Sequence, residues 1–592
     1  MDVRHCLAGA MAALTLLLPL AARSKCTIET AELPVTMVGV RAIATVRING
    51  TNVPMMVDSG AFYSFLTEAA AAQLKLKVDP MPARIVVKGL GGTVDTNITV
   101  VHKLELLGGD VPDVEFVVGG AEPGSGAMGV IGRNILSLAD TEYDLAHGAI
   151  RLVFPSDDCS KANMAYWAGA MPVSEVDLLR DNEDRLRLPA IRGIVQVNDK
   201  KLLALFDSGA YGTTMSLSAA HRLGLSNSDM TRSSTSYGAD GKPAKSWTAP
   251  FAKIDIGGEV ITNNRLRVTD YDMREDMLLG VDFFLSHRIY VSKKRRVMFL
   301  TYNGGRIFTD NTTGPVPAAA SAAASSADDA TLDADGYARR GAASASRGDY
   351  ASALADLDRA CALAPASASF FAQRAAIRLQ LKQPEKALAD IDKALQIDPQ
   401  QVDARMQRAA MRAHAKDNEG ALADLAELDR QLAPEAQPRV QMGRLYLVLH
   451  APAPAVAQFD QWIPHHAHEF QIENIRYDRC WARVQLNVAL DKAFDDCDAA
   501  VDADSKNATF LGGRAWVYLR QGKPAKARAD FDRSLAIRPK GAFSLYGRGL
   551  AEQRLGDAAA GQADLEAARK LSASIDADMA RLGLDKAGAS QP

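Results

Sequence analysis

Two short segments of the chain carry the same residues, Asp-Ser-Gly-Ala, in a setting that suits acid–base chemistry. Asp58 begins the first segment and Asp207 begins the second, and each follows an apolar run, 54–57 and 202–206. A lone Asp-Ser-Gly is more often an ordinary turn, because all three residue types favour turns. Two carboxyl groups that meet, however, can share one proton, so that one serves as a base while the other serves as an acid.

The residues around the two segments repeat at matched distances. Asn49 and Asn198 each lie nine residues before the aspartate, in the context of a hairpin turn. An apolar-apolar-Gly element follows 74 residues after Asp58 and 73 residues after Asp207. Glycines also recur 31 and 34 residues after each aspartate, at Gly89 and Gly92 and at Gly238 and Gly241, the second pair preceded by Tyr237. We conclude that one unit has been duplicated.

The elements that must position these residues are expected to be strands. Short apolar or alternating runs at 44–48, 83–87, 115–119 and 296–300 lie between Gly, Asn and Asp turn signals. The region 31–309 is therefore expected to be β-rich. Gly60 and Gly209 suit this arrangement, since a backbone without side chains can bring the two loops together.

This set of residues resembles that of the retropepsin-like aspartic proteases. The segment Ile131-Gly132-Arg133-Asn134 is similar to the apolar-apolar-Gly segment of the retroviral members of that family. The resemblance implies two lobes in one chain, 31–157 and 170–309, each donating one aspartate at a pseudo-twofold axis. It implies that Ser59 and Ser208 bond across the axis, and that the glycine segments form flap hairpins; plain surface hairpins are the alternative. The supporting residues are expected to be Ser59, Gly60, Ala61, Ser208, Gly209 and Ala210, with Ile131, Gly132, Leu279 and Gly280 as the apolar-Gly elements.

The expected reaction is hydrolysis of a peptide bond in a peptide or an unfolded protein. Two like charges about 4 Å apart at an effective dielectric near 20 repel by about 4 kcal/mol. This corresponds to a rise of roughly three in the pKa of the second carboxyl. The pair therefore holds one proton, and its titration belongs to the pair and to neither residue alone.

The first residues predict an exported protein. Arg4 is followed by a largely apolar run over 7–20 and by small residues, which is typical of a signal peptide, here assigned to 1–24. No second run of comparable length follows, so no membrane span is expected after its removal, and the location is periplasmic or secreted. In an oxidising compartment Cys26 and Cys159, and Cys480 and Cys497, are candidate disulfides, with unpaired thiols as the alternative.

The second half of the chain contains repeats of 34 residues. An alanine recurs at the same phase, and proline ends the second helical pattern of several units. These units resemble tetratricopeptide repeats, which implies seven two-helix units over 336–585 and a groove for a protein partner. An Ala, Ser and Pro-rich segment at 310–335 reads as a linker. The repeated alanine phase is Ala353, Ala387, Ala421, Ala455, Ala493 and Ala527, with Gly561 in the same position.

Other classes of function receive little support. The net charge of −3 does not show the excess of basic residues that is typical of nucleic-acid-binding proteins. His465, His466 and His468 lack a carboxylate set, so neither a metal nor a cofactor is expected. The sequence thus predicts a two-lobed all-β protease-like domain joined to an all-α solenoid, acting as an exported aspartic endopeptidase. The alternatives are a non-catalytic peptide-binding scaffold, and lobes that pair with those of another chain.

Overall fold

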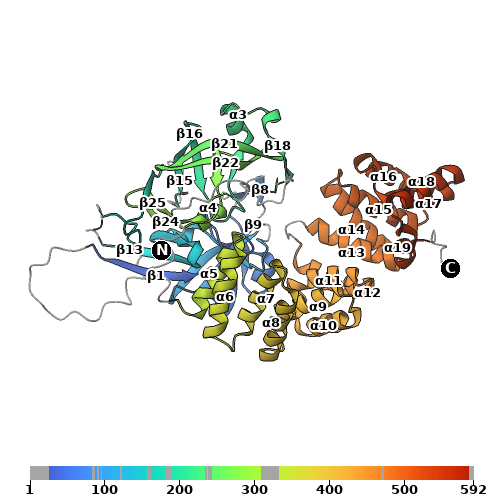
Figure 1. The fold of residues 1–592 in the computed structure, drawn as a ribbon, viewed down its shortest axis with the longest axis horizontal. Coiled ribbons are helices and arrows are strands. Elements are labelled where there is room, and N and C mark those ends of the chain that lie inside the picture. The colour runs from blue at the N-terminus through green and yellow to red at the C-terminus, as the bar shows by residue number, and fades with distance from the viewer. Residues whose placement is uncertain are drawn as a thin grey trace, which may run out of the picture. The chain divides into compact units, whose positions relative to one another are not determined.

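The computed structural model describes residues 26–82, 87–89, 92–94, 96–120, 123–156, 159, 162–180, 188–233, 236–237, 243–271, 273–308, 332–467 and 472–585. The predicted signal peptide and most of the predicted linker lie outside these residues. The chain divides into two compact units, 1–397 and 398–592. A β-rich half is followed by a series of helices (Figure 1), which confirms the predicted fold class.

Lobe 1, which we define as 31–157, is built on one twisted sheet. Among the described residues eight strands pair in the order β2-β3-β4-β11-β5-β10-β9-β6. Asn49 lies in the left-handed region with φ 49° and turns β3 into β4, as its place before Asp58 suggested. The strands are β2 (Thr36–Val38), β3 (Arg41–Ile48), β4 (Thr51–Val57), β5 (Phe65–Leu66), β6 (Val78–Pro80), β9 (Thr96–Leu106), β10 (Gly109–Gly119) and β11 (Gly129–Ile131), with α1 (Glu68–Gln73) and α2 (Arg133–Leu136) beside them.

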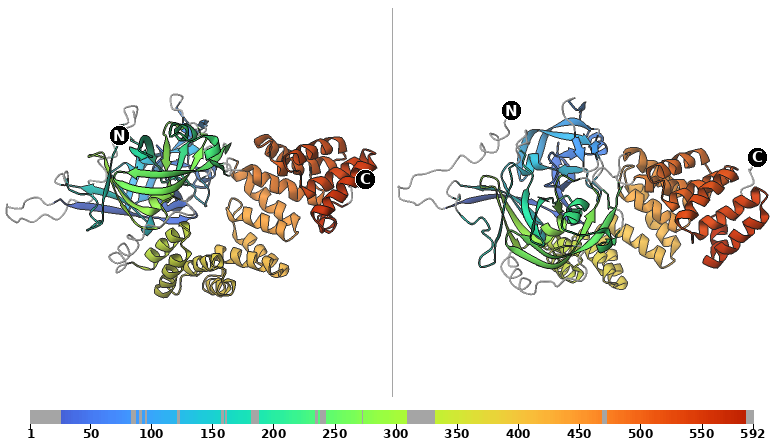
Figure 2. Two further views of the ribbon diagram at one scale, coloured as in Figure 1. Left: turned by 45° about the horizontal axis from the view of Figure 1, so that its top comes forward. Right: turned by 90° about the horizontal axis from the view of Figure 1, so that it is seen from above.

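Lobe 2, which we define as 170–309, is a second strand-rich body beside lobe 1 (Figure 2), and its strand order repeats that of lobe 1. In the part of the lobe that the structure describes, seven strands pair in the order β15-β16-β23-β17-β22-β21-β18. Asn198, with φ 48°, turns β15 into β16 as Asn49 does in lobe 1. The elements are β15 (Arg192–Val197), β16 (Lys200–Phe206), β17 (Thr214–Ser216), α3 (Leu217–Arg222), β18 (Thr231–Arg232), β21 (Ser246–Ile256), β22 (Glu259–Thr269), β23 (Met277–Leu279) and α4 (Val281–Ser286).

A third sheet joins the lobes. Six of the described strands pair in the order β1-β13-β12-β24-β25-β14, three from each half of the duplication. At its centre the buried Glu142 of β12 accepts hydrogen bonds from Arg151 Nη1 at 2.6 Å and from Arg288 Nε at 2.9 Å. Because Arg288 belongs to lobe 2, this charge cluster ties the lobes together. The strands are β1 (Ile28–Pro34), β12 (Asp140–Asp144), β13 (Ala149–Pro155), β14 (Ser174–Asp177), β24 (His287–Ser292) and β25 (Val297–Tyr302).

The helical half consists of antiparallel helix pairs that follow the 34-residue period. The repeated alanines lie on the second helix of successive pairs and are fully buried, which lets neighbouring helices approach closely. Within the described residues the pairs are α5 (Ala334–Ser346) with α6 (Tyr350–Leu363), α7 (Ala368–Gln380) with α8 (Pro384–Ile397), α9 (Val402–His414) with α10 (Asn418–Gln431), α11 (Pro438–Val448) with α12 (Pro452–Trp462), α13 (Ile472–Leu486) with α14 (Leu490–Ala503), α15 (Ala508–Arg520) with α16 (Pro524–Ile537), and α17 (Ala542–Arg554) with α18 (Ala558–Leu571), followed by α19 (Ile575–Arg581). Of the described helices, none is long and apolar enough to cross a bilayer.

Arginine–aspartate pairs recur through the repeats. In most pairs of helices an arginine on the first helix bonds through two nitrogens to a buried aspartate on the second, as Arg374 does with Asp390 at 3.0 and 2.7 Å. In the pair α11–α12 both partners are replaced, by Met442 and Gln458. Replacing both avoids a buried charge without a counterion, which is costly. The other pairs are Arg340–Asp356, Arg408–Asp424, Arg479–Asp496, Arg514–Asp530 and Arg548–Asp564.

Helix α5 packs against the β half, beside lobe 1 in Figure 1. Ala343 is fully buried in the same hydrophobic core as the strands of both lobes. Arg347, at the C-terminal end of the helix, donates from Nη1 to the Leu285 carbonyl of α4 at 2.9 Å. The Ser346 hydroxyl donates to the Gly39 carbonyl of lobe 1. The first helix of the repeats therefore contacts both lobes.

Candidate active site

Each predicted catalytic aspartate lies where a central strand ends. Asp58 follows β4 and Asp207 follows β16, and both strands run parallel to the strand of the apolar-Gly element, β11 or β23. The backbone N–H of Asp58 donates to the Ile131 carbonyl at 3.0 Å, and that of Asp207 donates to the Leu279 carbonyl at 2.9 Å. The sheet pairing thus fixes each aspartate next to the apolar-Gly element of its own lobe.

The two loops are locked together by their serines. The backbone N–H of Ser59 donates to Ser208 Oγ at 3.0 Å, and that of Ser208 donates to Ser59 Oγ at 2.9 Å. The hydroxyl of Ser59 donates to the Phe206 carbonyl at 3.1 Å, and that of Ser208 to the Val57 carbonyl at 3.3 Å. Both serines are buried, with 0 and 2 % of their surface exposed. Every donor in this exchange crosses from one lobe to the other.

The glycines bring the carboxyl groups together. A Cβ on Gly60 would lie 2.4 Å from Cγ of Asp207, and a Cβ on Gly209 would lie 2.2 Å from Cγ of Asp58. Each carboxyl group therefore lies against the glycine of the opposite lobe, inside the space that any side chain would fill. The lobes of one chain supply both halves of the pair.

One oxygen of each carboxyl group is held by backbone donors. Asp58 Oδ1 accepts from the N–H of Gly60 at 2.7 Å and of Ala61 at 2.9 Å. Asp207 Oδ1 accepts from the N–H of Gly209 at 2.9 Å and of the following alanine, Ala210, at 3.2 Å. These bonds orient the carboxyl groups and leave the second oxygen of each one open to other partners.

The environment favours a proton on the pair. Burial, the charge of Asp58 and a hydrogen bond between the two carboxyl groups raise the pKa of Asp207 well above its ordinary value. The N–H groups of Gly209 and Ala210 oppose this shift, because they stabilise the charged form. Burial, and then the charge of Asp58, also raise the pKa of Tyr143, which lies on β12 and is 1 % exposed.

The glycines of the apolar-Gly elements are required by close backbone contact. A Cβ on Gly132 would lie 2.5 Å from the carbonyl carbon of Tyr63, and one on Gly280 would lie 2.4 Å from that of Gly212. Since these partners are backbone atoms, they have no flexible end that can move away. Ile131 and Leu279, which precede the glycines, are fully buried.

Sequence reasoning missed a further pair of supporting side chains in each lobe. Asn134 Oδ1 accepts from both the N–H and the hydroxyl of Ser64 at 2.7 Å. In lobe 2 Asp282 Oδ1 accepts from the N–H of Thr213 at 2.9 Å and from its hydroxyl at 2.8 Å. Ser64 and Thr213 both lie six residues after the aspartate, so the matched spacing of the duplication contained this signal.

The predicted flap segments form short hairpins. Gly89 and Gly92 pair with each other where β7 (Val87–Gly89) meets β8 (Gly92–Val94). In lobe 2 Tyr237 pairs with Pro243 between β19 (Ser236–Tyr237) and β20 (Pro243–Ala244). Gly238 and Gly241 lie outside the described residues.

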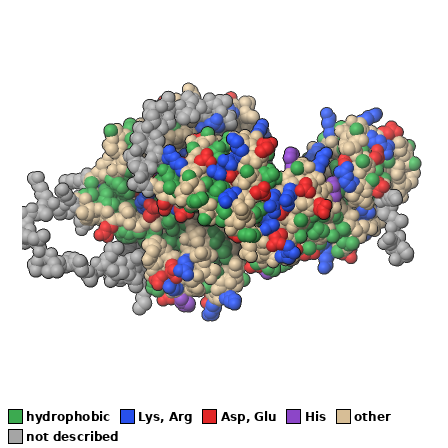
Figure 3. All heavy atoms as spheres, turned by 60° about the horizontal axis from the view of Figure 1, so that its bottom comes forward, with side chains coloured by type: hydrophobic (Ala, Val, Ile, Leu, Met, Phe, Trp, Pro, Cys, Tyr) green, Lys and Arg blue, Asp and Glu red, His purple; other side chains and the backbone are tan. Residues whose placement is uncertain are grey.

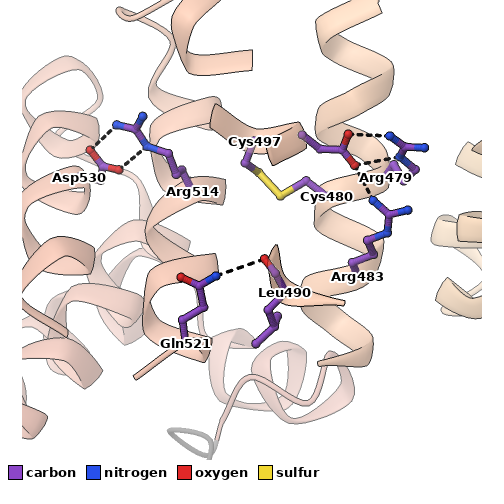
Figure 4. The surroundings of a disulfide bond; sticks show 9 residues. Arg479, Cys480, Arg483, Leu490, Cys497, Arg514, Gln521 and Asp530 are labelled. Atoms are coloured by element: carbon purple, nitrogen blue, oxygen red, sulfur yellow. Dashed lines mark hydrogen bonds and ion pairs between the residues drawn. A yellow bond between two sulfur atoms is a disulfide. The ribbon is translucent and has the colours of Figure 1, made fainter. Parts of the chain in front are cut away.

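Both candidate cysteine pairs are bonded in the structure. Cys26 joins Cys159 across 133 residues, beside the sheet that links the lobes. Cys480 joins Cys497 between α13 and α14, close to Arg479 and Arg483 of α13, which bond to Asp496 of α14 (Figure 4). Cys361 is unpaired and buried, and burial raises the pKa of its thiol to about 11.

The histidine cluster of the repeats has a local structural role. His466 stacks on Trp462 with ring centres 4.0 Å apart, and its Nε2 donates to the Glu435 carbonyl at 2.8 Å. His468 lies outside the described residues, and within the described part of the chain no three His, Cys, Asp or Glu side chains gather as metal ligands would.

On the face drawn in Figure 3 basic and acidic side chains are interspersed.

Comparisons with known proteins agree with this geometry. Residues 44–135 match the aspartyl protease family model, residues 194–286 match that of the gag-polyprotein aspartyl proteases, and residues 368–401 match a tetratricopeptide repeat. No curated protein matches the chain.

Several solved structures are similar at low identity. A tetratricopeptide repeat protein from Parabacteroides merdae ATCC 43184 is 19% identical, with a TM-score of 0.31, over 43% of this chain and 98% of that one. YrrB, a TPR protein with an unusual peptide-binding site, is 16% identical, with a TM-score of 0.22, over 37% and 92%. Basic 7S globulin from soybean is 12% identical, with a TM-score of 0.28, over 46% and 95%. The family matches confirm the predicted resemblance: the chain carries two retropepsin-like aspartyl protease domains followed by a tetratricopeptide-repeat solenoid.

Proposed function

We propose that the protein is an exported aspartic endopeptidase whose helical repeats recruit a substrate or a partner protein. The observation that carries the proposal is the meeting of Asp58 and Asp207, each packed on the glycine of the opposite lobe. The raised pKa of Asp207 supports a pair that keeps one proton at pH values where a single aspartate is ionised.

The proposed reaction uses one water molecule and the shared proton. The ionised carboxylate takes a proton from the water, whose oxygen attacks the peptide carbonyl carbon. The protonated carboxyl donates its proton to the carbonyl oxygen, giving a neutral tetrahedral gem-diol. One hydroxyl of the gem-diol then returns its proton to the ionised carboxylate of the pair. The other carboxyl group donates its proton to the amide nitrogen, the C–N bond breaks, and the starting protonation state is restored.

The chain's other residues have supporting roles in this proposal. The N–H donors of the two loops hold one oxygen of each carboxyl group, so the remaining oxygens can face water and substrate. The serine exchange keeps the loops at a fixed separation. Preorganised groups of this kind accelerate a reaction because they do not have to reorient during it.

Export and recruitment belong to the same proposal. The apolar N-terminal run and the two disulfides are typical of a protein that folds in an oxidising compartment. The repeats present an extended surface of stacked helices, and such surfaces commonly bind other proteins.

The proposal is tested with purified full-length mature protein and a diverse peptide library at several pH values, with and without a statine-type transition-state mimic. We expect cleavage that the mimic blocks. Asp58→Asn and Asp207→Asn should each lower kcat/KM by about 1,000-fold or more, since removal of a general acid or base typically costs 10²–10⁴.

The matched control is Asp199→Asn, which removes an exposed carboxylate in the β15–β16 turn. It should leave cleavage unchanged, and thermal unfolding should show that all three variants fold. Full activity in either dyad variant would overturn the proposal. Peptide binding without cleavage by the wild-type protein would instead favour the non-catalytic scaffold.

A further inference from the structure

The two dyad loops have matching hydrogen bonds, but only one of them holds an arginine. Arg41 opens β3, 17 residues before Asp58, and the residue 17 before Asp207 is Ala190. The positions correspond in the fold as well, because β3 pairs with β4 as β15 pairs with β16. The duplication therefore has a cation on one side and a methyl group on the other.

Arg41 reaches across to the dyad loop of lobe 2. Its Nη1 donates to the Gly209 carbonyl at 2.6 Å. Gly209 is the residue that packs on Asp58, where a Cβ would lie 2.2 Å from Cγ. The guanidinium group is thus one backbone carbonyl away from the proposed catalytic pair.

The charge of Arg41 is not balanced within the described residues. Arg41 is half-buried, and no described Asp or Glu forms an ion pair with it, unlike Arg47 of the same strand, which pairs with Glu105 at 2.8 Å. A guanidinium group has five N–H donors in a planar fork that matches a carboxylate. The Gly209 carbonyl uses one of them, and a partly buried cation gains most from a counterion.

We propose that Arg41 is a specificity residue that binds a carboxylate of the substrate on the lobe 2 side of the scissile bond. The inference rests on the proposed function and adds the substrate class, an acidic peptide. A substrate that lies extended advances about 3.3 Å per residue. A side chain one or two positions from the scissile bond therefore comes within reach of a group beside Gly209.

Two sources can supply this carboxylate, an Asp or Glu side chain or the C-terminus of the substrate. The test therefore uses internally quenched peptides in matched pairs, with Glu or Gln at each position around the cleaved bond. A second set carries a free or an amidated C-terminus. The full-length wild type is compared with Arg41→Met and Arg41→Lys, and the control is Arg47→Met, an exposed arginine on the same strand.

We expect the wild type to prefer the acidic member of one pair by about 10- to 100-fold in kcat/KM, which is the value of a charge-assisted hydrogen bond. Arg41→Met should remove this ratio, Arg41→Lys should retain part of it, and Arg47→Met should retain all of it. The position of the effect, internal or C-terminal, identifies the source of the carboxylate.

Two results would overturn the inference: no acidic preference in the wild type, or an equal loss by Arg41→Met on both members of each pair. The second result would mean that Arg41 only stabilises the contact between the lobes. Peptide binding to Asp207→Asn, with and without Arg41→Met, is measured by fluorescence anisotropy. If no peptide is cleaved, the proposed function fails, while a Glu-over-Gln difference in affinity that depends on Arg41 still supports this inference.

Discussion

Lobe 1 and lobe 2 are the same unit at the axis and different units away from it. In the two loops that meet at the axis, the Asp-Ser-Gly-Ala residues are identical, and Ser59 and Ser208 form matching pairs of hydrogen bonds. One contact further out, the supporting acceptor is an amide in lobe 1 and a carboxylate in lobe 2, Asn134 and Asp282. A residue that bonds to its counterpart across the axis must fit both its own lobe and the opposite lobe. A residue further from the axis must fit only its own lobe, so it can differ between the two copies.

The largest expected effect on stability comes from a disulfide whose two cysteines flank lobe 1, whereas lobe 2 contains no cysteine. Replacing Cys26 and Cys159 by serine opens a link across 133 residues and should lower the free energy of unfolding by about 2–5 kcal/mol. Removing the Cys480–Cys497 link, which spans 17 residues, should cost less because its loop is shorter. Denaturant unfolding measures both, and equal midpoints for wild type and the first variant would contradict the prediction.

The dyad glycines test whether the lobes are equivalent at the axis. A methyl group on Gly60 or Gly209 would overlap the carboxyl group of the opposite lobe. Displacing a catalytic group by about 1 Å can cost 100-fold, so Gly60→Ala and Gly209→Ala should each lower kcat/KM by about that factor. Gly109→Ala, in a roomier position of lobe 1, is the control. Very unequal losses would show that one lobe tolerates displacement.

The serines should show the same equivalence on a smaller scale. Ser59→Ala leaves the buried N–H of Ser208 without its acceptor, and Ser208→Ala does the reverse. An unsatisfied buried donor costs about 1–3 kcal/mol, so both variants should unfold earlier by similar amounts. Exposed Ser218, replaced by alanine, is the control. A stable variant of either buried serine would mean that the exchange does not hold the lobes.

The smallest effect is a pH dependence of stability. The folded-state pKa of Asp207 is raised above its unfolded value of about 3.9. Its stabilising contribution is therefore complete below about pH 4 and is lost as the pH rises through the raised pKa. Asp207→Asn removes this loss. The Tm of the variant minus the Tm of the wild type should therefore increase between pH 4 and pH 7. A difference in Tm that does not change with pH would contradict a raised pKa of Asp207.

The sequence contains most of the candidate site because the duplication repeats it. Matched distances from Asp58 and Asp207 predict the aspartates, serines and glycines that meet in the structure. The same distances contain Ser64 and Thr213, but their bonds to Asn134 and Asp282 depend on a fold that brings residues about 70 positions apart into contact. Arg41 was not predicted, because a single arginine has no counterpart to signal its role.

The fold class of the helical half can also be predicted from the sequence, but the packing of its first helix against the β half cannot. The alanine phase predicts the helix pairs, and arginine and aspartate about 16 residues apart repeat with them. Helix α5 begins at Ala334, and its alanines fit a neighbouring helix as well as a sheet. Only the structure shows that Ala343 belongs to the core of the β half.

The position of α5 has a consequence for processing of the chain. A backbone cut anywhere between Phe308 and Leu332 would sever the covalent connection between the β half and the repeats. The severed fragments would still be held by the core contact of Ala343 and by the bond from Arg347 to Leu285. A chain nicked at that point would therefore keep its repeats attached to the β half.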